Sequence, residues 1–282
     1  MNYIGIRGHR GAGKNTVAYL LGNTLEYLIN NSNNYLKISK NQEICELFQT
    51  WCDEIVNDER IIHEISLDNI YFESFGDTLK ILVQMILGCP QDILYSDYHK
   101  DHVVVNLRDF SYKTYDEIPQ DIKLWTAEEL YKEMPKNCAP ITITRNIFLS
   151  LREFILYFGK EVMQRYFGLD VWVKALKTTR ELFDNTNDLK SYKIYTDLKT
   201  PGEVTYIRKN GGLIIKVSRP DHKKQLKGID RLSQDNRYDF EVVIGDNLYD
   251  IIDQIIDIAD KILKTNKFLK EKYIYNEEET CS

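Results

Sequence analysis

The feature that most constrains this chain is a glycine-rich stretch near its start, between a short apolar run and a long helical pattern. It reads Gly-His-Arg-Gly-Ala-Gly-Lys-Asn-Thr, from Gly8 to Thr16. Four residues separate Gly8 from the Gly13-Lys14 pair, which is the spacing of a phosphate-binding loop. Glycines let the backbone curl tightly and point its N–H groups inward, and the following helix adds the positive end of its dipole. The pattern therefore predicts a strand, a phosphate-binding loop and a helix in succession.

The residues of this loop are the expected contacts to ATP and Mg²⁺. The predicted nucleotide-binding residues are Gly8, Gly11, Ala12, Gly13, Lys14, Asn15 and Thr16. Lys14, read as an exposed loop residue, would reach the β- and γ-phosphates. Asn15 stands where a Ser or Thr normally approaches Mg²⁺, so Thr16 is expected to supply a hydroxyl near the metal, through water. The ordinary alternative is a glycine-rich turn between a strand and a helix with no ligand.

Strand-like and helix-like runs alternate along the whole chain. Strands are expected at 2–6, 69–74, 192–196, 213–218 and 240–244, and helices at 14–29, 41–57, 78–87, 150–167, 171–183 and from about 248 onward. This alternation indicates an α/β fold with a five-stranded, parallel, doubly wound sheet flanked by helices.

Two segments do not follow this alternation. Residues 95–140 are polar, contain three prolines and have no sustained period. We expect an inserted lobe at about 95–147 within a single domain of residues 1–282. A basic segment at about 219–238 follows the fourth strand and is predicted to be a mobile lid, although an ordinary basic loop would have the same composition.

The charge balance limits the partners of the chain. It has 37 basic and 43 acidic residues, a formal net charge of -6. A protein that grips DNA or RNA usually carries a basic stripe, whereas the lysine-rich stretches here are short and interrupted by acids. A small anionic substrate needs only a few local cations. We therefore expect a small-molecule partner and no nucleic acid, and leave a homodimer open.

Cysteine spacing and apolar runs bear on the compartment. The five cysteines are scattered, with no CxxC pair, which fits a reducing environment. The chain has neither a signal-peptide pattern nor an 18-residue apolar run. We expect a cytoplasmic protein, in the host cytoplasm if it is viral, with no membrane partner.

A phosphate-binding loop alone does not separate kinases from GTPases, other ATPases or transporters. GTPases usually carry an Asn-Lys-x-Asp run late in the chain, and this sequence has none. The Lys-x-Thr ending of the loop, without a Ser or Thr directly after the lysine, is typical of small nucleotide kinases.

Four further segments carry a resemblance to a known family. The first is Phe75-Gly76-Asp77-Thr78-Leu79-Lys80; the second runs from Ser150-Leu151-Arg152 through Phe158-Gly159-Lys160-Glu161 to Arg165 and Val171-Trp172-Val173; the third is Asp197-Leu198-Lys199 with Glu203; the fourth runs from Gly211 to Arg219-Pro220. In order and spacing, these segments and the loop resemble the deoxynucleoside monophosphate kinases of bacteriophages, relatives of adenylate kinase. The resemblance covers about half of the chain.

The resemblance implies that ATP, with Mg²⁺, phosphorylates a deoxynucleoside monophosphate. The acceptor-side residues that it implies are Phe75, Asp77, Lys80, Arg152, Glu161, Arg165, Trp172, Asp197, Lys199 and Glu203. The catalytic cations that it implies are Lys14, Arg152, Lys199 and Arg219. Asp197 joins Thr16 near the metal, through water. The chain departs from the family at three places: Lys160 stands for Thr, Lys199 stands for Arg, and residues 245–247 read Gly-Asp-Asn in place of Asn-Asp-Gly. At position 199, lysine keeps the charge of arginine but loses its two-pronged donor geometry. The departures bear on the choice of acceptor and on the rate.

Ordinary structural roles compete with these assignments. On an ideal helix Arg152 and Arg165 differ by about 140°, so both cannot point straight into one cleft, and we favour Arg152. Arg152 could also belong to a solvated helix face, Trp172 could be a core anchor, and Asp197 could be a helix cap. The alternative functions are a dephospho-coenzyme A kinase-like enzyme, a polynucleotide 5′-kinase and a non-catalytic ATP-binding module.

Overall fold

The computed structural model describes residues 2–9, 11–31, 42–57, 67–133, 143, 145–183, 192–220, 237–245 and 247–279. The chain divides into two compact units. Unit 1 consists of Met1–Ser74 and Asn187–Ser282, and unit 2 is Phe75–Thr186, which contains the expected lobe and extends beyond it on both sides. No helix in the described ranges combines the length and the apolar character needed to cross a bilayer.

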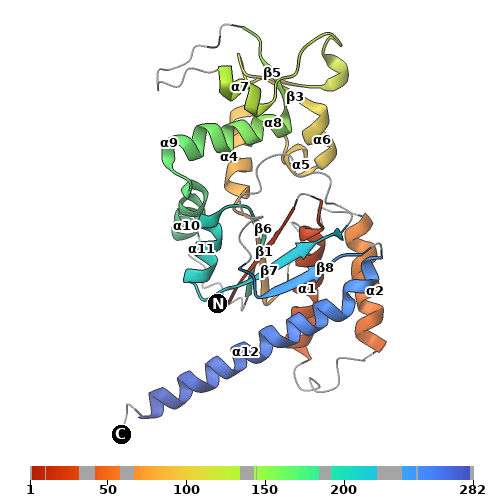
Figure 1. The fold of residues 1–282 in the computed structure, drawn as a ribbon, viewed down its shortest axis with the longest axis vertical. Coiled ribbons are helices and arrows are strands. Elements are labelled where there is room, and N and C mark those ends of the chain that lie inside the picture. Colours follow the sequence, from red (N-terminus) through yellow and green to blue (C-terminus); the bar gives the residue numbers. More distant parts are fainter. Residues whose placement is uncertain are drawn as a thin grey trace. The chain divides into compact units, whose positions relative to one another are not determined.

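Unit 1 is built on the expected five-stranded sheet, in which all strands are parallel (Figure 1). The strands are β1 (Asn2–Gly8), β2 (Ile70–Glu73), β6 (Tyr192–Leu198), β7 (Leu213–Ser218) and β8 (Phe240–Val243), in the order β2-β6-β1-β7-β8. The first strand of the chain therefore lies in the centre. Because parallel strands all end at the same edge, the segments that follow them gather there, and this carboxyl edge is where open α/β sheets bind ligands.

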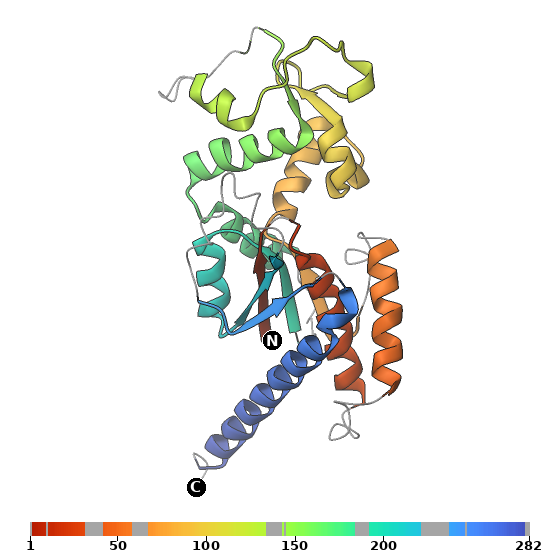
Figure 2. The same cartoon turned by 45° about the vertical axis from the view of Figure 1, so that its right-hand side comes forward.

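Helices cover both faces of this sheet. On one face, α1 (Lys14–Asn30) packs on β1 and β6, and α2 (Gln42–Asn57) and α12 (Ile252–Glu279) pack on α1 (Figure 2). A short turn of helix, η5 (Leu248–Ile251), precedes α12. On the other face, α11 (Pro201–Lys209) packs on β1 and β7. No helix was expected at 201–209, so α11 is a correction to the predicted elements.

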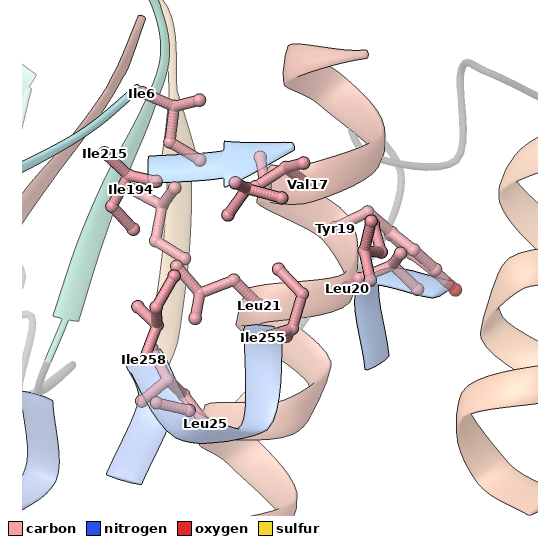
Figure 3. Close-up of a cluster of buried hydrophobic side chains, with 14 of the residues drawn as sticks. Ile6, Val17, Tyr19, Leu20, Leu21, Leu25, Ile194, Ile215, Ile255 and Ile258 are labelled. Atoms are coloured by element: carbon pink, nitrogen blue, oxygen red, sulfur yellow. The ribbon is translucent and has the colours of Figure 1, made fainter. Parts of the chain in front are cut away.

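The buried core of unit 1 joins α1 to the sheet and to α12. Figure 3 shows leucines of α1 beside isoleucines of α12 and of three strands. The labelled side chains are Ile6, Val17, Tyr19, Leu20, Leu21, Leu25, Ile194, Ile215, Ile255 and Ile258, and none is more than 4% exposed. Burying each side chain of this kind contributes roughly 1.5–3 kcal/mol. The helical period read from the sequence is confirmed, and this core holds the start of α1 in place behind the glycine loop, residues 8–16.

Unit 2 is mainly helical. Its helices are α4 (Asp77–Leu87), α5 (Gln91–Tyr95), α6 (Asp97–His102), η2 (Tyr115–Glu117), α7 (Ala127–Glu133), α8 (Leu151–Leu156), η3 (Tyr157–Gln164), α9 (Arg165–Phe167) and α10 (Val171–Phe183). It also contains a three-stranded antiparallel sheet in the order β4-β3-β5, from Tyr112–Thr114, Val103–Asn106 and Phe148–Ser150. This sheet was not expected, because strands of three or four residues are too short to show a period of two.

The segment 150–167 is helical as expected, but its middle is not an α-helix. The eight residues of η3 form a π-helix between α8 and α9. A π-helix bonds residue i to i+5 and is wider than an α-helix, so the angle of about 140° between Arg152 and Arg165 does not apply. Gly159 in η3 allows a close approach of α4, since a Cβ there would lie 2.7 Å from a methyl group of Leu79.

Candidate functional site

The glycine loop follows β1 at the centre of the carboxyl edge. Gly11 and Gly13 have φ values of 75° and 87°, a left-handed conformation that favours glycine. A Cβ at Gly8 would lie 2.5 Å from the carbonyl oxygen of Val217, and one at Gly13 would lie 2.6 Å from Ile244. Gly8, Gly11 and Gly13 are therefore required by backbone conformation or by close contact with Val217 and Ile244.

Lys14 lies against the loop rather than in open solvent. It is the first residue of α1 and half-buried, and its Nζ donates to the carbonyl oxygens of Gly8 and His9 at 2.9 Å each. The expectation that Lys14 is an exposed loop residue is wrong. The fold bends this side chain back, so that the ammonium lies at the loop.

The N-terminus of α1 has the electrostatic character that favours an anion. Its N-cap residue, Gly13, makes no side-chain hydrogen bond, and the first turn contains no acidic residue. The first N–H groups of a helix have no partner within the helix and carry partial positive charge. Within the loop, Gly11 and Asn15 are exposed, Ala12 is buried and Thr16 is half-buried. Thr16, the predicted source of a hydroxyl near Mg²⁺, is therefore less exposed than Asn15.

Residues that end or follow two other strands, β6 and β7, lie at the same edge of unit 1. In the parallel registers, Arg7 pairs with Leu198 of β6 and Gly8 pairs with Val217 of β7. Asp197 therefore lies beside the end of β1, and the exposed Arg219, just after β7, lies near the start of the loop. Most of the predicted lid, residues 221–236, and position 246 lie outside the described residues.

The carboxylate of Asp197 is contacted by Ser74 and by Lys199. Ser74, which follows β2 and is 3% exposed, donates its Oγ to Oδ1 at 2.7 Å. The Nζ of Lys199 lies 2.8 Å from Oδ2. The cap of the following helix is Thr200, so the helix-cap interpretation of Asp197 is wrong. Sequence reasoning missed Ser74, whose only signal is its position at the end of a strand.

Glu203 is bound to the main chain at the start of α11. Its carboxylate accepts from the N–H groups of Lys199 at 2.5 Å and of Thr200 at 2.9 Å, which completes a capping box with the Thr200 hydroxyl. The side chain is 4% exposed. Burial, with a further contribution from the charge of Asp197, raises the pKa of Glu203 to about 7. This geometry favours a structural role for Glu203, which was predicted on the acceptor side.

The raised pKa of Glu203 makes the stability of the protein depend on pH. Its folded-state pKa of about 7 lies above the ordinary glutamate pKa of 4.5, so the folded protein binds this proton more tightly than the unfolded chain. The stabilisation is complete below about pH 4.5 and is lost as the pH rises through 7. Glu203→Gln keeps a capping-box acceptor but does not titrate. We expect the free energy of unfolding of the wild type, relative to this variant, to fall by up to about 3 kcal/mol between pH 4.5 and 8. Urea unfolding across this range measures it, and parallel pH profiles would contradict it.

A metal site made by protein side chains alone is not present in the described ranges. No three His, Cys, Asp or Glu side chains gather there into a group able to hold a metal ion. Mg²⁺ bound with a nucleotide, however, needs only one or two protein carboxylates or hydroxyls besides phosphate and water. Asp197 already has a cation, the Lys199 ammonium, on one oxygen. The residues at the edge of unit 1 therefore fit the Mg²⁺ of a nucleotide.

In unit 2, two of the predicted acceptor-side residues lie together on α4. Lys80 Nζ lies 3.1 Å from Asp77 Oδ1 and 3.9 Å from the centre of the Tyr95 ring. The Tyr95 hydroxyl donates to the same carboxylate oxygen at 3.1 Å. Phe75, next to them in sequence, is 1% exposed. The cation at position 80 is thus fixed by an aspartate and an aromatic face.

Arg152 is bound by two aspartates of α6, a helix that was not expected from the sequence. Its Nε and Nη2 lie 2.5 and 3.0 Å from the two carboxylate oxygens of Asp101, and Nη2 lies 3.2 Å from Asp97. Lys100 also pairs with Asp97, at 3.2 Å. Burial lowers the pKa of Arg152, but Asp101 and Asp97 outweigh it and the net direction is upward. The side chain is 18% exposed, so the solvated-face interpretation of Arg152 is wrong.

The remaining acceptor-side residues have separate partners within unit 2. Arg165 lies over the ring of Tyr131, 5.0 Å from its centre. Glu161 pairs with Lys160 at 3.3 Å, which fits an ordinary local pair. Trp172 is 6% exposed and supports the core-anchor interpretation. Arg152 and Arg165 therefore contact different side chains.

Comparison with known proteins gives no family: no protein-family model matches the chain, and no curated protein sequence matches it. Function is therefore inferred from the chemistry of the glycine loop and the residues described above.

Proposed function

We propose that this protein binds ATP with Mg²⁺ at the glycine loop and transfers the terminal phosphate to a deoxynucleoside monophosphate. The observation that carries the proposal is the position of Lys14: its ammonium lies at the loop, 2.9 Å from two loop carbonyls, at the N-terminus of α1. A cation, inward N–H groups and a helix dipole at one place are what a polyphosphate requires.

Each residue of this edge has a role in the proposal. The loop N–H groups bind phosphate oxygens, and Lys14 exchanges its two carbonyl partners for the β- and γ-phosphates. Thr16 and Asp197 would hold Mg²⁺, through water, and the metal would supply positive charge that offsets the repulsion of the phosphates. Arg219, exposed after β7, adds a cation on the side of the predicted lid. Phosphoryl transfer needs positioning and neutralised charge more than covalent chemistry, and these residues supply both.

The acceptor assignment rests on the resemblance and on the cations of unit 2. Within unit 2, Lys80 and Arg152 provide the charge for a monophosphate. Arg152 would exchange a carboxylate partner for phosphate, because its fork fits both groups. The finer fold assignment, a nucleoside monophosphate kinase with an acceptor lobe at about 95–147 and a lid at about 219–238, belongs to the same proposal.

A panel assay tests the proposed function. ADP release is measured with ATP and Mg²⁺ plus each deoxynucleoside monophosphate, each ribonucleoside monophosphate, dephospho-coenzyme A or a 5′-hydroxyl oligonucleotide. We expect release with at least one deoxynucleoside monophosphate, with the diphosphate as the product. Turnover of dephospho-coenzyme A alone, or salt-sensitive turnover of the oligonucleotide, would identify that compound as the acceptor instead of a deoxynucleoside monophosphate. ATP binding without turnover of any acceptor would make the protein an ATP-binding module.

Arg152→Ala tests the acceptor side. We expect the KM for the monophosphate to rise far more than the KM for ATP, because the glycine loop holds ATP independently. Arg152→Lys, which keeps the charge and loses the fork, should fall between the wild type and alanine. Thermal unfolding is the control, since alanine also removes the partner of Asp97 and Asp101. Equal rises in both KM values, or none, would leave Arg152 with only the structural role of joining α8 to α6.

A further inference from the structure

The two oxygens of Asp197 contact one buried side chain, Ser74, and one exposed side chain, Lys199. Ser74, on Oδ1, is 3% exposed and lies just after β2, whose last residue, Glu73, pairs with Tyr195 of β6. Because Ser74 is buried and directly follows a strand that pairs with β6, its hydroxyl has little room to move. Lys199, on Oδ2, has a side chain that is 66% exposed. Ser74 is thus the fixed contact of Asp197 and Lys199 the exchangeable one.

The Ser74 contact determines which way the carboxylate faces. Hydrogen bonds from a hydroxyl to an ionised carboxylate are among the stronger ones, and this one is 2.7 Å long. Ser74 contacts Oδ1, and the Lys199 ammonium lies 2.8 Å from Oδ2. The lysine side chain is 66% exposed and the Asp197 side chain 15% exposed, so the ammonium can leave into solvent while the carboxylate stays in place.

We propose that Ser74 is a positioning residue for Asp197: it fixes the carboxylate so that Oδ2 is presented to the Mg²⁺ of bound ATP, directly or through water. This inference rests on the proposed function, because it concerns the metal of the nucleotide. Groups that orient a metal's ligand commonly change metal affinity 10- to 100-fold when they are removed. Without the Ser74 hydroxyl the carboxylate can rotate, and Lys199 competes for both oxygens.

Binding of N-methylanthraniloyl-ATP, followed by fluorescence, tests the inference without turnover. The analogue is titrated in EDTA and at increasing Mg²⁺ concentration. We expect Ser74→Ala to raise the Mg²⁺ concentration for half-maximal binding about tenfold. Its affinity in EDTA should stay within about twofold of the wild type, because the loop and Lys14 are intact. Ser74→Thr, which keeps the hydroxyl, should stay near the wild type.

Two controls separate positioning from general loss of stability. Thr24→Ala removes another buried hydroxyl of unit 1, which donates to Leu20 O at 2.7 Å in α1, and should not change the Mg²⁺ dependence. In an Asp197→Asn background, Ser74→Ala should cause no further shift. An unchanged Mg²⁺ dependence in Ser74→Ala, or an equal shift in Thr24→Ala, overturns the inference alone. Failure of the wild type to bind the analogue overturns the proposed function as well.

Discussion

Replacing Lys14 with alanine is expected to lower kcat/KM for ATP-dependent transfer by well over tenfold, a loss above about 1.4 kcal/mol of transition-state stabilisation. The ammonium lies at the loop, 2.9 Å from the carbonyl oxygens of Gly8 and His9, where the phosphates are proposed to bind. Alanine removes the side-chain cation that contacts these two carbonyls. Steady-state kinetics with the best acceptor of the panel measure the loss.

The Lys14 result needs a stability control, because the side chain contacts the loop. Alanine removes two hydrogen bonds from loop carbonyls as well as a phosphate contact. Circular dichroism and thermal unfolding show whether the fold remains, and Lys209→Ala, an exposed lysine in the last turn of α11, serves as the matched charge control. If a folded Lys14→Ala protein kept more than about a tenth of wild-type kcat/KM, the assignment of the loop as the ATP site would be wrong.

Replacing Lys199 with alanine is expected to cost on the order of 2–4 kcal/mol in kcat/KM, the range for loss of one transition-state donor. Lys199 follows β6 at the carboxyl edge, and its exposed ammonium is held by Asp197 at 2.8 Å. In the proposed reaction it leaves Asp197 and meets the acceptor phosphate as a point charge. Lys199→Arg should preserve or improve activity, because guanidinium offers two parallel donors to phosphate.

The competing interpretation of Lys199 is an exposed ion pair with no catalytic role. Such pairs contribute roughly 0–1 kcal/mol, so alanine would then be nearly silent in kcat/KM. Lys261→Ala is the matched control, since Lys261 pairs with Asp257 on the exposed side of α12 and is expected to be silent. If Lys199→Ala and Lys261→Ala both left kcat/KM unchanged, Lys199 would not be a catalytic residue.

The elements predicted correctly from the sequence are those that a local pattern specifies. Apolar residues at helical spacing predicted α1 over 14–29, and the helix spans Lys14–Asn30. The run at 213–218 matches β7, and the alternation of strands with helices predicted a parallel sheet. The glycines of the loop were also legible, because a left-handed φ at Gly11 and Gly13 is a local backbone requirement.

One missed element had a local signal. Thr200, Pro201 and Glu203 are a capping box with proline at the first helical position, which is a helix start signal. Two parallel strands with α11 between them also need a crossover connection. The helix is only nine residues long, too short for its apolar period to stand out.

The contacts that define the site could not be read from the sequence. Ser74 meets Asp197 across 123 positions, and Arg152 meets Asp97 and Asp101 across 55 and 51. Hydrophobic period, capping and turn chemistry act within a few residues, and no such rule selects a partner so far away. The sequence by itself determined the sheet, the loop and the kinds of charge available. Which carboxylate holds which cation, and which oxygen it presents, was decided by the tertiary structure, because strand order and helix packing bring those side chains within hydrogen-bonding distance.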